Sequence, residues 1–186
     1  LAALATIQLA LPIGILAGRY PSRSTTLLEQ STYVTHALPG IVIAISMVFL
    51  GVRLLEPIYL RTPLLVIAYV ALFLPVAVGS IRSAAEQIPD TLDEVSRSLG
   101  LSPWGIVRRV TLPLLAPGLL SAGALVMLAG MKELPATMLL RPTGSETLAS
   151  RLWTYTSVSD YAGAGPYALA IIVFVSIPTA IASRRL

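Results

Sequence analysis

The chain is dominated by long runs of residues that carry no charge. Five such runs occur within its 186 residues, at 1–18, 30–52, 62–81, 110–131 and 161–183. Each is long enough for a helix that crosses the hydrocarbon core of a bilayer, because roughly 20 residues at helical rise cover that thickness. The runs therefore predict an all-α, polytopic membrane protein with five transmembrane helices.

The composition supports a membrane protein and excludes several other classes. With 55% hydrophobic residues, 12% charged residues and a mean hydropathy of +0.81, the chain is too apolar for an ordinary soluble domain. The absence of cysteine excludes disulfides and thiolate metal sites, and a single histidine leaves no histidine-rich metal cluster. We therefore expect no metal site, no cofactor and no catalytic constellation.

The charged residues indicate the surroundings of the chain. A net charge of +4 would suit nucleic acid, but the basic residues stand at the edges of apolar runs and form no patch with aromatic residues. They are typical of membrane-flanking charges, so we expect a lipid bilayer and no nucleic acid. The chain opens at Leu1 inside an apolar run, which argues against a signal peptide. We expect one transmembrane domain over residues 1–186, a fragment without its upstream spans.

A polar interval, residues 83–113, separates the third run from the fourth. Asp90 can cap a short helix, and Gly100 can end that helix in a left-handed conformation. Ser102 followed by Pro103 then offers a second helix start. The first helix is predicted to be amphipathic, with Leu92, Val95 and Leu99 on one face and Asp93, Glu94, Arg97 and Ser98 on the others. The second helix is expected to turn into the next apolar run near Pro113 and Pro117.

Five residues of this interval fall at the intervals of a known motif: Glu94, Gly100, Val110, Leu112 and Pro113. They resemble the EAA loop of permease subunits in bacterial ABC importers, which reads Glu-Ala-Ala, then Gly, then a hydrophobic residue followed by any residue, Leu and Pro. This sequence departs from the motif at Val95 and Ser96, where the motif has alanines. An amphipathic cytoplasmic loop also occurs in other multi-span proteins, so the surrounding spans carry part of the interpretation.

The resemblance implies a fold, a function and a set of partners. It implies a MetI-like permease core in the bacterial cytoplasmic membrane, with residues 83–113 as a cytoplasmic coupling loop that docks on an ABC ATPase. It also implies a second permease unit, as a homodimer or a fused half, and an extracytoplasmic substrate-binding protein. The sequence has no Gly-x-x-x-x-Gly-Lys-Ser/Thr loop. ATP hydrolysis is therefore expected on a separate subunit, and this chain is not predicted to be an enzyme.

Two other classes of membrane protein compete with the importer. A secondary transporter or channel would favour interrupted, paired half-helices or charged residues in mid-span, and the five runs contain no charge. A membrane enzyme would need convergent His, Asp or Glu groups at membrane depth, which the runs lack.

The distribution of Lys and Arg predicts the orientation. If residues 83–113 are cytoplasmic, that side carries eight basic residues, Arg19, Arg23, Arg82, Arg97, Arg108, Arg109, Arg184 and Arg185. The other side carries five, Arg53, Arg61, Lys132, Arg141 and Arg151. This bias agrees with the positive-inside rule and places residues 132–160 outside.

The stretch after the fourth run carries a second resemblance. It reads Met131-Lys132-Glu133-Leu134-Pro135-Ala136-Thr137, then Leu140-Arg141-Pro142 and Thr147-Leu148-Ala149. It looks like the corresponding stretch in permeases of the ferric-iron importer group, which implies ferric iron as cargo. Permeases for thiamine, phosphonates and polyamines are related, so these cargoes remain alternatives.

Four charged residues outside are candidates for the translocation path or for docking of the binding protein: Lys132, Glu133, Arg141 and Arg151. The adjacent Lys132 and Glu133 end a span, where such charges face a water-filled path or a partner, or form an interfacial ion pair. Both readings remain open from the sequence. The single histidine, His36, is interpreted as a packed or interfacial residue rather than a ligand.

Overall fold

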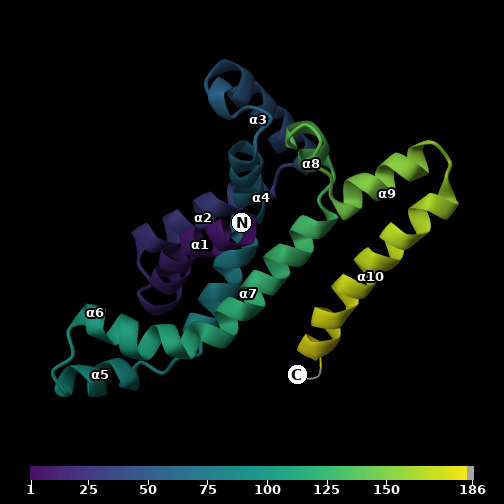
Figure 1. The fold of residues 1–186 in the computed structure, drawn as a ribbon. Helices are drawn as coiled ribbons and strands as arrows, with labels where there is room; N and C mark the ends of the chain where they lie inside the picture. The colour runs from purple at the N-terminus through teal and green to yellow at the C-terminus, as the bar shows by residue number, and fades with distance from the viewer. Residues whose placement is uncertain (184–186) are drawn as a thin grey trace. The chain divides into compact units, whose positions relative to one another are not determined.

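The computed structural model describes residues 1–183, and their side chains as far as residue 176 (Figure 1). Over this range the chain is helical and contains no strand, so the predicted all-α fold is confirmed. The helices are α1 (Ala2–Arg19), α2 (Arg23–His36), α3 (Gly40–Arg53), α4 (Thr62–Glu86), α5 (Thr91–Ser98), α6 (Pro103–Ile106), α7 (Leu112–Lys132), α8 (Pro135–Leu140), α9 (Leu148–Ser157) and α10 (Tyr161–Ser183). A 3-10 turn, η1 (Glu56–Ile58), and a π-helical turn, η2 (Val107–Thr111), complete the order. Arg184 and Arg185, counted above on the cytoplasmic side, lie outside the described residues.

Among the described residues, three helices are long and apolar enough to cross a membrane: α1, α4 and the continuous helix Pro103–Lys132. Two further segments bear on the predicted number of spans. Helices α2 and α3 would add a crossing if the broken pair forms one span, and Tyr161–Ser176 is a shorter apolar helix. The structure is therefore that of a multi-pass membrane protein, while the count of five spans stays a prediction.

The second apolar run is not one straight helix. It breaks between His36 and Gly40, where Pro39 takes an extended backbone with φ −57° and ψ 138°. Proline has no N–H for the helical ladder, and it disfavours helical geometry in the residue before it. The chain therefore leaves α2 and starts α3 at Gly40, with no cap from the Pro39 side chain.

Internal contacts divide the described chain into two units. The first consists mainly of residues 3–37 and 73–126, and the second of residues 38–72 and the residues from 127 onward. The C-terminal part of α4 thus belongs to the first unit and its N-terminal part to the second. The polar interval 83–113 lies entirely within the first unit.

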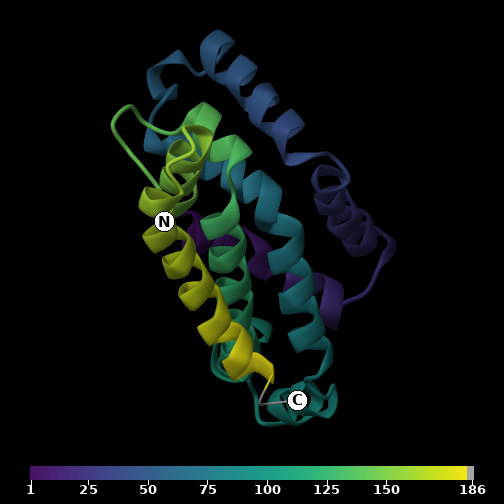
Figure 2. The ribbon, with the colours of Figure 1, turned by 90° about the vertical axis from the view of Figure 1, so that its right-hand side faces the viewer.

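The first unit is built on close helix contacts along the C-terminal part of α4. A Cβ added to Gly14 would lie 2.7 Å from a side-chain carbon of Ile81, and one added to Gly18 would lie 2.8 Å from the Arg82 carbonyl oxygen. Figure 2 shows α1, in purple, crossing α4 in this region. On α7, a Cβ added to Gly118 would overlap the Cβ of Ala84. Small residues therefore let both α1 and α7 approach α4 closely.

The second unit has a compact apolar core in which α3, α4 and α8 meet. Its fully buried members are Ala44, Leu64, Ala68, Ala136 and Leu140. Helices α9 and α10 pack against each other, with the rings of Tyr155 and Tyr167 stacked at 5.5 Å between centroids. The polar stretch 132–160 thus contains two helices of its own, α8 and α9.

The glycine contacts predict opposite effects for one substitution at two sites. Gly18→Ala should destabilise the protein by about 1–3 kcal/mol, because the new methyl group meets the Arg82 carbonyl and Ala85. Gly123→Ala, in α7, has open space within 4 Å and should be neutral or stabilising by up to about 1 kcal/mol through helix propensity. Thermal unfolding of the two detergent-solubilised variants checks this, and equal shifts would contradict the α1–α4 contact.

Candidate functional site

The polar interval folds as two short helices joined by a tight turn, visible at the lower left of Figure 1. Gly100 follows α5 with φ +83°, so the predicted left-handed residue is confirmed. The amide of Gly100 donates to the Arg97 carbonyl at 2.9 Å, and that of Leu101 donates to the Ser96 carbonyl at 3.0 Å. These two bonds form a Schellman motif, which satisfies carbonyls at the end of α5.

The start of the second helix also agrees with the sequence. The Ser102 hydroxyl accepts from the Gly105 amide at 3.2 Å, and Pro103 is the first helical residue. Serine can make this bond because its backbone is extended, with φ −68° and ψ 158°.

The prediction that the Asp90 side chain caps the first short helix is wrong. Asp90 occupies the residue before α5, but its side chain makes no capping hydrogen bond. Its backbone is helical, with φ −65° and ψ −27°, whereas a capping side chain needs an extended backbone to turn back onto the first amides. The Asp90 carboxylate instead lies 3.9 Å from the guanidinium of Arg19.

Helix α5 exposes its apolar face and buries part of its polar face. Leu92, Val95 and Leu99 are 36%, 55% and 77% exposed, while Asp93 and Ser96 are buried. Glu94 is exposed as well, and on α6 the indole of Trp104 is 71% exposed. We call Leu92, Glu94, Val95, Leu99 and Trp104 the coupling surface, after the coupling loop that the EAA-like pattern predicts here. A contiguous exposed apolar patch is typical of a binding site for a partner.

Asp93 is held by the end of α1. An Arg19 guanidinium nitrogen lies 2.6 Å from one carboxylate oxygen of Asp93, and the Tyr20 hydroxyl donates to the other at 3.3 Å. Arg19 also donates to the Ile88 carbonyl at 2.5 Å. The side chains of Arg19 and Asp93 are only 2% and 11% exposed. The sequence had suggested only a flanking charge for Arg19; the available signal was its place on the same predicted side as residues 83–113.

The sequence suggested a turn between the second short helix and the next apolar run near Pro113. The structure instead has one continuous helix through this region. Val110, Leu112 and Pro113 lie within the continuous helix Pro103–Lys132. The Leu112 amide donates to the Val107 carbonyl, a π-type bond that belongs to the turn Val107–Thr111. Because Pro113 has no amide to donate, a wider turn before it lets the helix continue without a break.

A basic cleft of about 560 Å³ lies beside the turn between the short helices. It is lined by Gly100, Leu101, Ser102, Trp104, Gly105, Arg108 and Arg109. Both arginines are exposed. Next to the turn at Gly100, the cleft therefore combines the aromatic ring of Trp104 with the positive charges of Arg108 and Arg109.

In the stretch that follows α7 and resembles ferric-iron permeases, Glu133 and Thr137 form hydrogen bonds within the second unit. One Glu133 carboxylate oxygen accepts from the Ala136 amide at 3.0 Å, at the start of α8. The Thr137 hydroxyl donates to the Glu133 carbonyl at 2.6 Å and shares a hydrogen bond with the Tyr69 hydroxyl. The described residues show no ion pair between Lys132 and Glu133, and Lys132 is exposed. Glu133 therefore stabilises the first turn of α8.

Arg141 and Arg151, which the sequence predicts to lie outside, also have partners close in the chain. Arg141 donates to the Ser145 carbonyl at 3.1 Å and to the Ser150 hydroxyl at 3.2 Å. Arg151 forms an ion pair with Glu146. Both contacts stabilise the loop that leads into α9, whose first turn is closed by a Thr147–Ser150 capping box. The structure does not bring these arginines together with Lys132.

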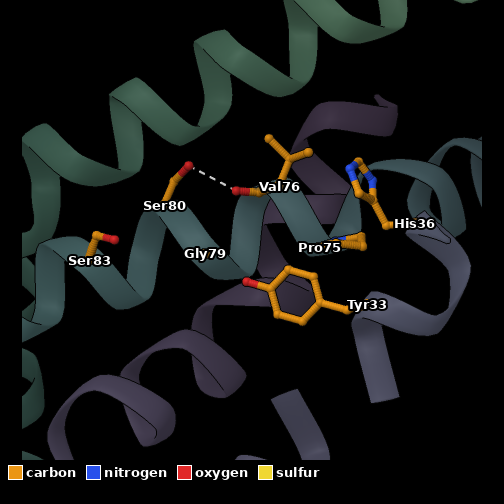
Figure 3. Close-up of a pocket in the computed structure, with 7 residues that line it drawn as sticks. All are labelled: Tyr33, His36, Pro75, Val76, Gly79, Ser80 and Ser83. Atoms are coloured by element: carbon orange, nitrogen blue, oxygen red, sulfur yellow. Dashed lines mark hydrogen bonds between the residues drawn. The ribbon is translucent and has the colours of Figure 1, made fainter. Parts of the chain in front are cut away.

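His36 lines a shallow cavity of about 370 Å³ in the first unit (Figure 3). The other lining residues are Tyr33, Pro75, Val76, Gly79, Ser80 and Ser83. Within the part of the chain that the structure describes, no group of three or more His, Cys, Asp and Glu side chains could hold a metal ion. Sequence reasoning missed the neighbouring charge network, in which the buried Glu29 accepts from Arg82 at 2.6 and 2.7 Å.

Comparison with known proteins gives a family match over nearly the whole chain. The protein family described as "Binding-protein-dependent transport system inner membrane component" matches residues 10–184. The Fe(3+)-transport system permease protein FbpB 2 of Haemophilus influenzae is 42% identical over 178 residues, which cover 96% of this chain and 35% of that protein. The putative 2-aminoethylphosphonate transport system permease protein PhnV of Salmonella typhimurium is 26% identical, over 83% of this chain and 58% of that protein.

The chain thus spans between about a third and three fifths of the length of these two curated relatives. Among solved structures, an inward-facing MetNI methionine ABC transporter chain matches with a TM-score of 0.77 and 19% identity. That match covers 98% of this chain and 87% of the transporter chain. At this identity the likeness concerns the fold, and it confirms the expected MetI-like architecture.

The positive φ at Gly100 predicts a local defect on substitution. Gly100→Val should cost about 1 kcal/mol or more, because a β-branched side chain is strained in the left-handed region. Hydrogen exchange should then rise across residues 91–111. Gly144→Val is the matched control, since Gly144 has φ +81° in a different loop and its effect should stay near residues 141–147. Unchanged exchange at residues 91–111 would contradict the role of Gly100.

Proposed function

The chain belongs to the family of binding-protein-dependent transport system inner membrane components, and from this premise we propose that it is the permease of an ATP-driven importer of ferric iron. It is a multi-pass component of the inner membrane. We propose the transport reaction, ATP as its energy source and ferric iron as its cargo. The observation that carries the proposal is the coupling surface, an apolar helix face turned outward beside an exposed carboxylate.

The coupling surface fits docking on a separate ATPase subunit. Leaving Leu92, Val95 and Leu99 in water is unfavourable by about 25 cal/mol per Å² of apolar area, so a partner that covers them gains that free energy. Glu94 and the exposed arginines of the basic cleft add charges that set the orientation of the partner. ATP hydrolysis then takes place on the partner, and this chain supplies the surface that receives its motion.

The connections of the coupling surface suggest how motion reaches the membrane. Helix α5 follows α4 after a short turn, and α6 continues without a break into α7. A displacement of the two short helices therefore acts directly on two long apolar helices, as in a lever. Alternating access also needs a second permease unit around the path, and delivery of cargo needs a substrate-binding protein outside. Both are proposed as partners.

The choice of ferric iron rests on the degree of similarity to relatives. The ferric permease of Haemophilus influenzae is 42% identical and the phosphonate permease of Salmonella typhimurium is 26% identical. The stretch from Met131 to Ala149, which resembles ferric importers, is the subfamily signal in the sequence. Import of 2-aminoethylphosphonate is the second candidate, because the relative named for it covers 83% of the chain.

A charge reversal tests the docking role of Glu94. In the assembled transporter, Glu94→Lys should abolish most ATP-driven uptake and leave membrane insertion intact, because the side chain is exposed and lies outside every long helix. Glu56→Lys is the matched control, since Glu56 is also exposed but lies in a different loop. Uptake is measured at equal membrane levels of each variant. Normal uptake by Glu94→Lys would remove this residue from the ATPase contact.

The cargo is tested by stimulation of ATP hydrolysis. The full complex, reconstituted with its ATPase, is mixed with binding proteins loaded with ferric iron, thiamine, 2-aminoethylphosphonate or a polyamine. We expect stimulation by the ferric-loaded protein alone. Stimulation by another loaded binding protein, with none by the ferric one, would overturn the cargo while leaving the importer function in place.

A further inference from the structure

We propose that Arg19 and Asp93 form a positioning pair that makes α1 part of the coupling machinery. The pair fixes α5 to the end of α1, so that α1, the C-terminal part of α4 and α5 move as one body when the ATPase acts. This inference rests on the proposed function and adds to it a helix that neither the EAA-like pattern nor the coupling surface contains.

The geometry at the end of α1 joins three parts of the chain. One Arg19 nitrogen contacts the Asp93 carboxylate at 2.6 Å, which reaches α5, and another donates to the Ile88 carbonyl at 2.5 Å, which reaches the turn after α4. The Tyr20 hydroxyl adds a second contact to Asp93 at 3.3 Å. One guanidinium thus holds both the start of the interval and its first helix.

Burial makes this pair different from an ordinary surface ion pair. The Arg19 side chain is 2% exposed and the Asp93 side chain 11% exposed, so neither charge can exchange its partner for water. The 2.6 Å contact between Arg19 and Asp93 is an ion pair without hydrogen-bond geometry, so it contributes attraction rather than direction. Direction comes from the hydrogen bonds beside it, from Arg19 to the Ile88 carbonyl and from the Tyr20 hydroxyl to the other Asp93 oxygen. Together these contacts restrict rotation of α5 as well as its separation from α1.

The adjacent carboxylates Asp93 and Glu94 have different environments. Successive residues on a helix point about 100° apart, so the clamp on Asp93 decides where Glu94 and the apolar face point. With Asp93 held inward by Arg19, Glu94 is exposed together with Val95. The buried pair therefore sets the presentation of the coupling surface.

The packing of α1 explains why its end can serve as an anchor. Gly14 and Gly18 bring its backbone against Ile81, Arg82 and Ala85 of α4, with no room for even a methyl group. Close contact between two helices over a full turn leaves little freedom for sliding. Arg19 follows Gly18 directly, so its position is fixed by this contact.

The functional test compares uptake with ATP hydrolysis in the reconstituted transporter. Arg19→Gln and Asp93→Asn should each lower the uptake of cargo per ATP hydrolysed by about tenfold, because α5 loses its fixed direction. The double variant should be no worse than either single variant, since both remove the same contact. Arg23→Gln, at an exposed arginine near Arg19, is the control and should leave the ratio unchanged. A normal ratio in both single variants would overturn the proposal.

A distance measurement separates positioning from general stability. The sequence has no cysteine, so Leu16→Cys on α1 and Ser98→Cys on α5, both exposed, place one spin label on each of the two helices. The distance between the labels should stay the same in the nucleotide-free and ATP-bound complexes. Adding Arg19→Gln should broaden the distance distribution. A shift on ATP binding in the parent chain, or an unchanged distribution with Arg19→Gln, would overturn the proposal.

Each outcome also bears separately on the proposed function. If Arg19→Gln fails to assemble, the comparison of the two nucleotide states in the parent chain still decides whether α1 and α5 move as one body. If the unaltered complex shows no ATP-driven uptake with any of the four cargoes, the proposed function fails. The label distances in the nucleotide-free protein, with and without Arg19→Gln, would still show whether the ion pair fixes α5.

Discussion

The close contact of α1 and α7 with the C-terminal part of α4 is the constraint on which the first unit depends. In a membrane, helices gain little from hydrophobic burial against each other, so association relies on close packing of small residues. Gly14, Gly18 and Gly118 supply that contact, and none could gain a methyl group without displacing a neighbour. The ends of α1, α4 and α7 are thereby held where the chain leaves the apolar helices, which is where the short helices α5 and α6 begin.

The coupling surface has a polarity that is unusual for a surface helix. Helix α5 turns leucine and valine outward and buries an aspartate, which is the reverse of an amphipathic helix on its own core. The buried charge is tolerated because Arg19 compensates it, and the exposed apolar face is the surface that we propose the ATPase covers. In the proposed docking, α5 presents a surface whose direction is already fixed.

The motif that indicates the ferric subfamily has a structural explanation in this protein. Glu133 supports the first turn of α8, Thr137 joins that turn to Tyr69 on α4, and Ala136 lies in the apolar core. These side chains hold α8 and leave only Lys132 among the charged residues of the motif exposed. The residues of this stretch therefore hold α8 in place in the second unit.

The sequence by itself determined the helical class, the helix start at Ser102 and the turn at Gly100, because these depend on local hydrogen bonds and on the apolar character of each run. Ser102 and Gly100 need only their nearest neighbours to cap a helix, so their roles were predictable. Only the tertiary structure decided that Asp93 points inward, because that depends on a guanidinium 74 positions earlier in the chain being brought beside it. The same holds for Glu133: the sequence left open whether Lys132 and Glu133 face a path or a partner or form an ion pair, and folding placed the Glu133 carboxylate at the Ala136 amide, one of the donors that lack a partner at the start of α8.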